Sequence, residues 1–525
     1  MGWNAILYRE GERIMRNGRW IGLAVGWLMI SSLAPFADVR PNALFSEGMV
    51  LQQGKPIPVW GTADEGEMVH VSLGDQRVAT VARDGRWMVT LNPMKAGGPH
   101  TMIIEGKNDL VFENVLVGEV WIGSGQSNMQ WTVANSNNAE QEIAQADYPN
   151  IRLFSVPRTV AGRPQKDVNA KWEVCTPQTV PNFSAVLYFF GRELHKNLNV
   201  PVGLIHTSWG GTPAESWTTR ETLLGHEKLK GMVERWDKMI EDFDNQLDQY
   251  AEKMIEWEQN ADQAEAEGRP VPAPPEFPRD PRNQPWRPAG LYNAMIAPLI
   301  PYAIQGAIWY QGESNASRAY QYRILFPAMI QDWRDHWGQG DFPFLFVQLA
   351  NFIAGEPEEP WAELREAQTM ALSLPNTGMA VTIDIGNPTD IHPRNKQDVG
   401  YRLALAARKI AYGQEIVYSG PIYDSMTRED SRVRIRFQHV GSGLMAKNNE
   451  PLKGFTIADS GRKFVPAGAR IEGDTVVVWS DEVKDPVAVR YGWKHNPDCN
   501  LYNKEGLPAS PFRTDDWPGV TINNE

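Results

Sequence analysis

The chain has 525 residues, of which 42% are hydrophobic and 22% are charged. This is ordinary globular composition, which excludes a disordered or collagen-like chain, and the length predicts two to four domains. Lysine and arginine number 51 against 64 aspartates and glutamates, so the formal net charge is −13 at pH 7. A negative charge of that size repels phosphate backbones and argues against nucleic acid as a partner. The two cysteines, Cys175 and Cys499, are too few for a disulfide framework, and we expect two free thiols.

The N-terminus has the features of an export signal. Arg9, Arg13, Arg16 and Arg19 form a basic region, and the apolar stretch 20–34 that follows carries no charge. This stretch is shorter than the roughly 20 residues of a membrane-spanning helix, so cleavage is favoured over an uncleaved anchor. Residues 1–37 are therefore predicted to be a signal peptide. We expect export to the periplasm or outside the cell, with no membrane segment left after cleavage.

Residues 38–115 are predicted to form a small β-sandwich. Five short runs alternate apolar with other residues, and turn residues such as Asp84 and Gly85 end them. Short strands at regular spacing are typical of sandwiches, and this region contains no cluster of catalytic residue types.

Residues 116–417 have a different pattern, in which continuous apolar runs alternate with amphipathic helical patterns. Runs of this kind fit strands buried on both faces, and their alternation with helices predicts a parallel sheet covered by helices. Ligand sites in such sheets lie beyond the carboxyl ends of the strands. The predicted strands are 115–122, 202–207, 304–310, 344–349 and 379–385, and the predicted helices are 184–198, 320–337, 363–374 and 396–410.

An insertion at about 221–285 interrupts this region. Its apolar residues follow helical spacing and acidic residues fill the gaps, which predicts an amphipathic helix or helix pair before a proline-rich return. The acidic polar face favours packing against the main body over binding a membrane surface. Residues 418–525 return to alternating patterns and are predicted to form a C-terminal β-rich domain.

Unusual polar residues follow four of the predicted strands. The first set is the glycine-rich turn 123–129, which carries Ser127 directly after strand 115–122. A hydroxyl at a helix start, beside free backbone N–H groups, suits a nucleophile and its oxyanion. A plain N-cap serine is an equally simple interpretation of this turn alone.

Two more sets follow the next strands. Gly210 and Gly211 come after 202–207 and can offer backbone N–H groups, although a tight turn explains them as well. Gln311, Glu313 and Asn315 come after 304–310, where loop solvation and helix capping are the alternatives.

The fourth set is Asp384, Asp390 and His392, after strand 379–385. A histidine there can act as a general base, with a nearby acid that orients it. A lone histidine is more often structural. However, the four sets fall at the same edge of one predicted sheet, and together they indicate a Ser-His-acid hydrolase site.

The stretches that carry these residues resemble the sialate O-acetylesterase family, a branch of the SGNH-type serine esterases that is related to some acetylxylan esterases. The matching segments are GEVWIGSGQSNMQW, GLIHTSWGGTPAESW, IWYQGESNA and DIHPRNKQDVGYRLAL, and flanking segments extend the resemblance over nearly all of the mature chain. It implies an α/β fold with a flavodoxin-like three-layer core, an acetylated carbohydrate substrate, and neither metal nor cofactor. It also implies Ser127 as nucleophile, His392 as base, and oxyanion donors from the Ser127 amide and from Gly210 or Gly211.

The chain departs from the SGNH pattern in two places. Glu313 falls where the superfamily often has an asparagine, and a carboxylate would repel an oxyanion, so Gln311 or Asn315 is the better donor candidate. Asp390 precedes His392 by two residues where the family's acid usually precedes it by three. Glu313 therefore rivals Asp390 for orienting His392, and Asp384 is a weaker rival.

Substrate-binding candidates lie next to these motifs. Trp131 and Trp217 follow the active-site turns and are candidate sugar platforms, while Arg318 and Arg394 are candidates for gripping a sialic acid carboxylate. The same ester chemistry would serve acetylated xylan or another polysaccharide, and abundant tryptophan would also suit a non-catalytic carbohydrate-binding protein. The sequence leaves the oligomeric state open.

Overall fold

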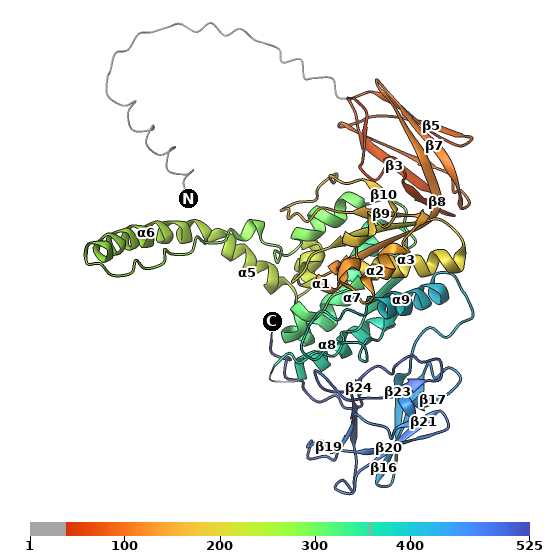
Figure 1. The fold of residues 1–525 in the computed structure, drawn as a ribbon, viewed down its shortest axis with the longest axis vertical. Helices are drawn as coiled ribbons and strands as arrows, with labels where there is room; N and C mark the ends of the chain where they lie inside the picture. The colour runs from red at the N-terminus through yellow and green to blue at the C-terminus, as the bar shows by residue number, and fades with distance from the viewer. Residues whose placement is uncertain (1–37, 356–358, 525) are drawn as a thin grey trace. The chain divides into compact units, whose positions relative to one another are not determined.

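The structure of the protein, a computed structural model, describes residues 38–355 and 359–524 (Figure 1). The predicted signal peptide, 1–37, lies outside the described residues. Within the described ranges no helix is both long and apolar enough to cross a bilayer. Cys175 and Cys499 are free thiols, as expected.

The predicted parallel sheet is confirmed and forms the centre of the fold (Figure 1). Its strand order is β10-β9-β11-β8-β12-β13-β14, and every neighbouring pair except β9 and β10 runs parallel. The strands are β8 (Asp109–Gly125), β9 (Tyr148–Ser155), β10 (Trp172–Cys175), β11 (Val202–Ser208), β12 (Gly306–Tyr310), β13 (Phe344–Val347) and β14 (Thr377–Ala380). The sequence patterns did not predict β9 and β10. The continuously buried part of β9 is only Ile151–Phe154, too short a run to stand out.

Helices cover both faces of this sheet, which gives the expected three layers. Consecutive strand residues point to opposite faces, so Ile308 packs in one apolar cluster and Trp309 in another. Ile308 shares its cluster with α3 (Ala185–Leu198) and α9 (Lys396–Ile410), and Trp309 shares its cluster with α7 (Ala319–Trp337) and α8 (Glu359–Met370). The sequence sets the helix starts locally: Ser184 caps α3, and Asn395 caps α9.

The long strand β8 joins the N-terminal β-region to the central sheet. Its first part pairs antiparallel with β7, and its last part pairs with β11 and β12. The predicted boundary at 115–116 therefore falls inside one continuous strand, because the sequence pattern changes there with the partner sheet and not with a linker. The other N-terminal strands are β1 (Arg40–Pro41), β2 (Val50–Gln52), β3 (Ile57–Thr62), β4 (Met68–Leu73), β5 (Gln76–Val81), β6 (Arg86–Leu91) and β7 (Gly97–Glu105).

The C-terminal residues form antiparallel sheets that are tied to the catalytic region. The buried Arg365 of α8 donates hydrogen bonds to the backbone carbonyls of Lys494 and His495, at 2.6 and 2.8 Å. The strands are β15 (Ile422–Glu429), β16 (Arg432–Gln438), β17 (Leu444–Ala446), β18 (Phe455–Ala458), β19 (Val465–Pro466), β20 (Gly468–Glu472), β21 (Thr475–Trp479), β22 (Ala488–Tyr491), β23 (Leu501–Asn503) and β24 (Phe512–Arg513).

The insertion contains an amphipathic helix pair, α5 (Lys230–Glu241) and α6 (Phe243–Ala266), as its apolar spacing predicts. A short helix that was not predicted, α4 (Arg220–Gly225), precedes the pair. The proline-rich return runs back along them: the indole N–H of Trp257 in α6 donates to the carbonyl of Pro272 at 2.8 Å. Two short helices, α1 (Ser127–Gln130) and α2 (Ala139–Ala144), follow β8.

Candidate active site

Ser127 is the first residue of α1, at the carboxyl end of β8. The chain leaves the strand at Gly125, which has φ +135°, and a Cβ there would lie 2.1 Å from the carbonyl oxygen of Tyr310. Only glycine fits this exit. Within the described residues the Ser127 N–H has no acceptor, as expected for the first turn of a helix. The turn therefore presents a hydroxyl and a free backbone donor at one point.

The structure brings Ser127 and His392 into contact. Ser127 Oγ lies 2.8 Å from His392 Nε2, although the two residues are 265 positions apart. His392 lies in the loop between β14 and α9, so the two side chains come from turns at the same edge of the sheet. This distance is within the reach that a base needs to remove the proton of a hydroxyl.

Three neighbours surround the imidazole of His392. The indole of Trp131 stacks on it, with ring centroids 5.3 Å apart and 13° between the planes. Asp390 Oδ1 lies 3.7 Å from Nδ1 and accepts the backbone N–H of His392 at 2.8 Å. Burial lowers the pKa of His392; the negative charge of Asp390 opposes that shift, and the positive charge of Lys396 adds to it. The neutral imidazole, which can accept a proton, is therefore favoured more than in an ordinary histidine at the same pH.

The other two candidate carboxylates have different partners. Glu313 Oε1 accepts a hydrogen bond from Asn128 Nδ2 at 2.6 Å, and no contact joins it to His392 in the described chain. Asp384 forms a two-bond ion pair with Arg402, at 2.6 and 2.8 Å. Among the three candidates only Asp390 lies beside the imidazole, because the two-residue spacing turns its carboxylate back onto the His392 amide.

A buried polar network lies beneath the Ser-His pair. Asn128 Nδ2 donates to the carbonyl of Ile391 at 3.0 Å as well as to Glu313, and Lys396 Nζ donates to Asn128 Oδ1 at 2.6 Å. Asn128 follows Ser127 in the chain and Ile391 precedes His392. The side-chain amide of Asn128 therefore links the chain segment that carries Ser127 to the segment that carries His392.

The sequence analysis overlooked Asn128 and Lys396, although both lie inside the motif segments around Ser127 and His392. Burial lowers the pKa of Lys396 to about 7, with the charge of Glu313 opposing the shift, and burial raises the pKa of Glu313. The available signal was a polar residue close to each candidate catalytic residue: Asn128 directly follows Ser127, and Lys396 lies four positions after His392.

Replacing Lys396 by methionine is expected to weaken the fold and to shift the pKa of the base. Removing one partner from a buried charged network costs about 3–5 kcal/mol of unfolding free energy. Below pH 7 the protonated Lys396 lowers the pKa of His392, so its loss should raise that pKa and move the acid limb of kcat/KM to higher pH. Chemical denaturation and a pH-rate profile measure the two effects. A variant with unchanged stability and an unchanged profile would contradict this role, and Glu313→Gln added to Lys396→Met should restore part of the stability.

Replacing Asp390 by asparagine should lower kcat by about tenfold or more, because an imidazolium formed at His392 loses its nearest negative charge. Asp390 raises the pKa of His392, so the acid limb should move to lower pH. Steady-state kinetics from pH 4 to 8 measure both changes. The exposed carboxylate of Glu140, replaced by glutamine, is the control. Equal behaviour of the two variants would mean that Asp390 does not orient His392.

Of the candidate oxyanion donors, the backbone amides are placed at the site and the side-chain amides are not. Gly210 lies against Ser127: a Cβ on it would be 3.2 Å from Ser127 Cβ, and its N–H donates to Gln130 Oε1 at 2.7 Å. The N–H of Gly211 has no acceptor within the described residues.

Gln311 and Asn315 are instead committed to the interior. The Gln311 amide nitrogen donates to Asn315 Oδ1 at 2.6 Å, and the Asn315 amide nitrogen donates to Glu215 Oε2 at 2.9 Å. Both side chains are buried, so neither faces a bound substrate. The expectation that one of them donates to the oxyanion is wrong, because strand β12 ends with these amides turned into the core.

The substrate-binding candidates also divide into side chains that are used within the fold and side chains that a substrate can reach. Trp217 is 0% exposed and packs edge-on against Trp309, so it is a core residue and not a sugar platform. Trp131 uses one ring face to cover His392. Arg394 donates to the backbone carbonyls of Asn135 and Ser136, so its guanidinium is largely committed to the fold.

Arg318 lies on a groove next to the site. It pairs with Glu215 at 2.6 Å. The groove also contains Gly211 and Ser314, which belong to the turns beside Ser127.

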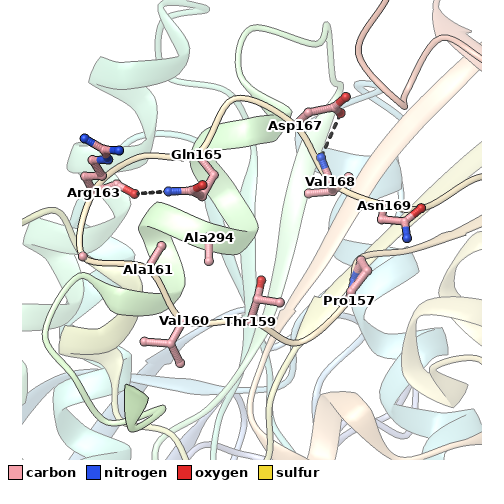
Figure 2. Close-up of a pocket in the computed structure, with 11 residues that line it drawn as sticks. Pro157, Thr159, Val160, Ala161, Arg163, Gln165, Asp167, Val168, Asn169 and Ala294 are labelled. Atoms are coloured by element: carbon pink, nitrogen blue, oxygen red, sulfur yellow. Dashed lines mark hydrogen bonds between the residues drawn. The ribbon is translucent and has the colours of Figure 1, made fainter. Parts of the chain in front are cut away.

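A larger hollow of about 670 Å³ lies in the loop after β9 (Figure 2). Figure 2 shows two hydrogen bonds within the loop: Gln165 donates to the carbonyl of Arg163, and Asp167 accepts the N–H of Val168. Of the described residues that line this hollow, none is a serine, cysteine or histidine. In the described ranges no group of three or more His, Cys, Asp and Glu side chains is arranged to hold a metal ion.

Comparisons with known proteins found relatives that match most of the chain. A family model described as "Carbohydrate esterase, sialic acid-specific acetylesterase" matches residues 117–267 and 282–409. The sialate O-acetylesterases of Mus musculus and Homo sapiens are 33% and 30% identical to the chain. These matches cover 88% and 96% of this chain, and 92% and 99% of the relatives. A solved carbohydrate acetylesterase from Xanthomonas citri is 39% identical, with a TM-score of 0.79 over 91% of this chain and 100% of its own.

Proposed function

The chain belongs to the sialic acid-specific acetylesterase family of carbohydrate esterases, and from that membership we propose a serine mechanism centred on Ser127. The protein is a carboxylic ester hydrolase that removes O-acetyl groups from carbohydrate. The observation that carries the proposal is the 2.8 Å contact between Ser127 Oγ and His392 Nε2. A hydroxyl is a weak nucleophile until an adjacent base takes its proton.

In the first half-reaction Ser127 Oγ attacks the acetyl carbonyl carbon while His392 Nε2 takes the hydroxyl proton. The negative charge develops on the carbonyl oxygen, and the N–H groups of Ser127 and of Gly210 or Gly211 stabilise it. To take part, the Gly210 N–H must break its hydrogen bond to Gln130 Oε1 and donate to this oxygen instead. The ester C–O bond then breaks, the sugar oxygen receives the proton from His392, and an acetyl-Ser127 remains.

In the second half-reaction water takes the place of the sugar. His392 removes a proton from the water, the resulting hydroxide attacks the acetyl-Ser127 carbonyl, and acetate leaves as Ser127 recovers its proton. Asp390 stabilises the imidazolium in both halves, and Trp131 holds the ring in position by stacking. The lowered pKa of His392 favours the neutral form that acts as the base.

We propose O-acetylated sialic acid as the substrate, because relatives named sialate O-acetylesterase match nearly the whole chain. Acetylated xylan or another polysaccharide is the second candidate, since the more similar Xanthomonas citri structure is described only as a carbohydrate acetylesterase. Acetate release from O-acetylated sialic acid and from acetylated xylan, measured side by side, distinguishes them. Sugar binding without hydrolysis of any acetate ester would instead indicate a non-catalytic carbohydrate-binding protein.

Export is proposed from the basic and apolar pattern of residues 1–37. N-terminal sequencing of the protein recovered from the periplasm or the medium tests it. A mature chain that begins near position 38 is the expected result. A chain retained in the cytoplasm with an intact N-terminus would contradict the proposal.

A further inference from the structure

A groove of about 560 Å³ lies between the inserted helix α5 and the turns that carry the catalytic motifs. Gly211, Pro213 and Ser314 come from the turns after β11 and β12. Trp236 and Met239 come from α5, and Trp286 comes from the segment that returns from the insertion. Nothing in the proposed acetyl transfer uses these three apolar side chains.

The groove begins beside Ser127. Gly211 follows Gly210, whose Cβ position is 3.2 Å from Ser127 Cβ. The N–H of Ser314 donates to the side chain of Gln126, the residue before Ser127, at 3.3 Å. An acetylated sugar held at Ser127 therefore has the groove as its neighbour, and the rest of a glycan has a path into it.

The groove walls have the chemistry that binds sugar rings. Trp286 is 42% exposed, and its indole N–H is held by the carbonyl of Gly211 at 2.8 Å. Trp236 is half-buried with its N–H held by the carbonyl of Pro281 at 3.1 Å, and Met239 is 47% exposed. Both indoles are fixed in orientation before any ligand binds, so they lose little entropy when the C–H face of a sugar packs on them.

Charged groups supply the polar part of the groove. Arg318 is fixed by Glu215 at its inner end, while the exposed Arg235 makes no ion pair within the described residues. The guanidinium N–H groups of Arg235 and Arg318 can donate hydrogen bonds to sugar hydroxyls, and the carboxylate of Glu215 can accept them. Apolar walls with a few fixed polar groups are the usual composition of a small-molecule site.

We propose that this groove is a subsite for the sugar next to the acetylated one, so that the enzyme prefers acetylated oligosaccharides to acetylated monosaccharides. The proposal rests on the proposed function, since it places the acetylated sugar at Ser127. It gives the insertion a role in substrate selection in addition to packing.

The first test compares kcat/KM for an acetylated oligosaccharide with kcat/KM for the matching acetylated monosaccharide. The unmodified enzyme should prefer the oligosaccharide by about tenfold or more. Trp236→Ala should remove most of this preference through a higher KM. Trp286→Phe keeps an aromatic face while it loses the bond to Gly211, so it should retain more of the preference than Trp286→Ala.

Trp257→Ala is the matched control. Trp257 lies in the same insertion, is half-buried, and donates its indole N–H to a proline carbonyl, as Trp236 does, but it is not part of the groove. It should keep the full preference. An equal loss in Trp236→Ala and Trp257→Ala would mean that the insertion acts only through its stability and would overturn the subsite.

The second test measures binding without turnover. Calorimetry of Ser127→Ala protein with the deacetylated oligosaccharide should detect binding that the added Trp236→Ala substitution weakens about tenfold. If this binding is found but the unmodified enzyme hydrolyses no acetate ester, the serine mechanism is overturned and the groove is supported. Hydrolysis with no oligosaccharide preference, and no binding that depends on Trp236, would overturn the groove and leave the mechanism standing.

Discussion

Replacement of Ser127 by alanine is expected to lower kcat for acetate release by about 10⁴-fold or more. Without Oγ no acetyl-enzyme forms, and what remains is the stabilisation that the backbone N–H groups give to a direct attack by water. Acetate release from an aryl acetate and from an acetylated sugar measures the loss. Acetate release by Ser127→Ala protein at an unreduced rate would rule out the serine mechanism.

The chain supplies a matched control for this experiment in a second Ser-His pair. Ser208 Oγ lies 2.6 Å from His206 Nε2, but Ser208 is only 3% exposed, and burial lowers the pKa of His206 to about 4. A substrate ester does not reach a hydroxyl inside the core. Ser208→Ala should therefore keep kcat within a few-fold, so a large loss there would indicate that serine removal acts through the fold.

Replacement of His392 by alanine is the second large effect, expected at about 10⁴-fold in kcat. Ser127 then has no base within reach, and the leaving sugar oxygen has no proton donor. The acid limb of the pH profile, which the lowered pKa of His392 places below its ordinary range, should disappear from the residual rate. Rates with the aryl ester between pH 4 and 8 measure this.

The two residues should also act as one unit. The Ser127→Ala/His392→Ala double variant should be about as slow as the slower single variant, because each substitution alone already prevents acyl-enzyme formation. Losses that multiply in the double variant would mean that the two side chains work independently, and would contradict the mechanism.

Local sequence signals determined much of the fold. The strands β11, β12 and β13 follow continuous apolar runs, and α9 begins directly after the capping Asn395, as the pattern predicts. Strand β9 escaped prediction because its buried run is short. The continuity of β8 through two sheets escaped because the residue pattern changes where the strand changes partners, as it also does at a domain boundary.

Within the site, the sequence by itself identified a serine turn, a histidine loop and three carboxylates at one edge of a parallel sheet. Only the tertiary structure decided which of them meet. Asp390 lies beside His392, while Glu313 and Asp384 are held by Asn128 and Arg402. Residue type and spacing limit what chemistry a side chain can perform. Its partners are set by the tertiary structure: Glu313 is held by a residue 185 positions away, which no local pattern records.

Tertiary packing also decides which tryptophans are core residues and which line the groove. The sequence made Trp217 a sugar-platform candidate and placed Trp236 only among the helically spaced apolar residues of the insertion. In the structure Trp217 is sealed in the core, and Trp236 lies on a groove beside the nucleophile. The sequence determined that the chain would have indoles near its ester chemistry. The packing of the inserted helix against the strand-end turns decided which of them a sugar can reach.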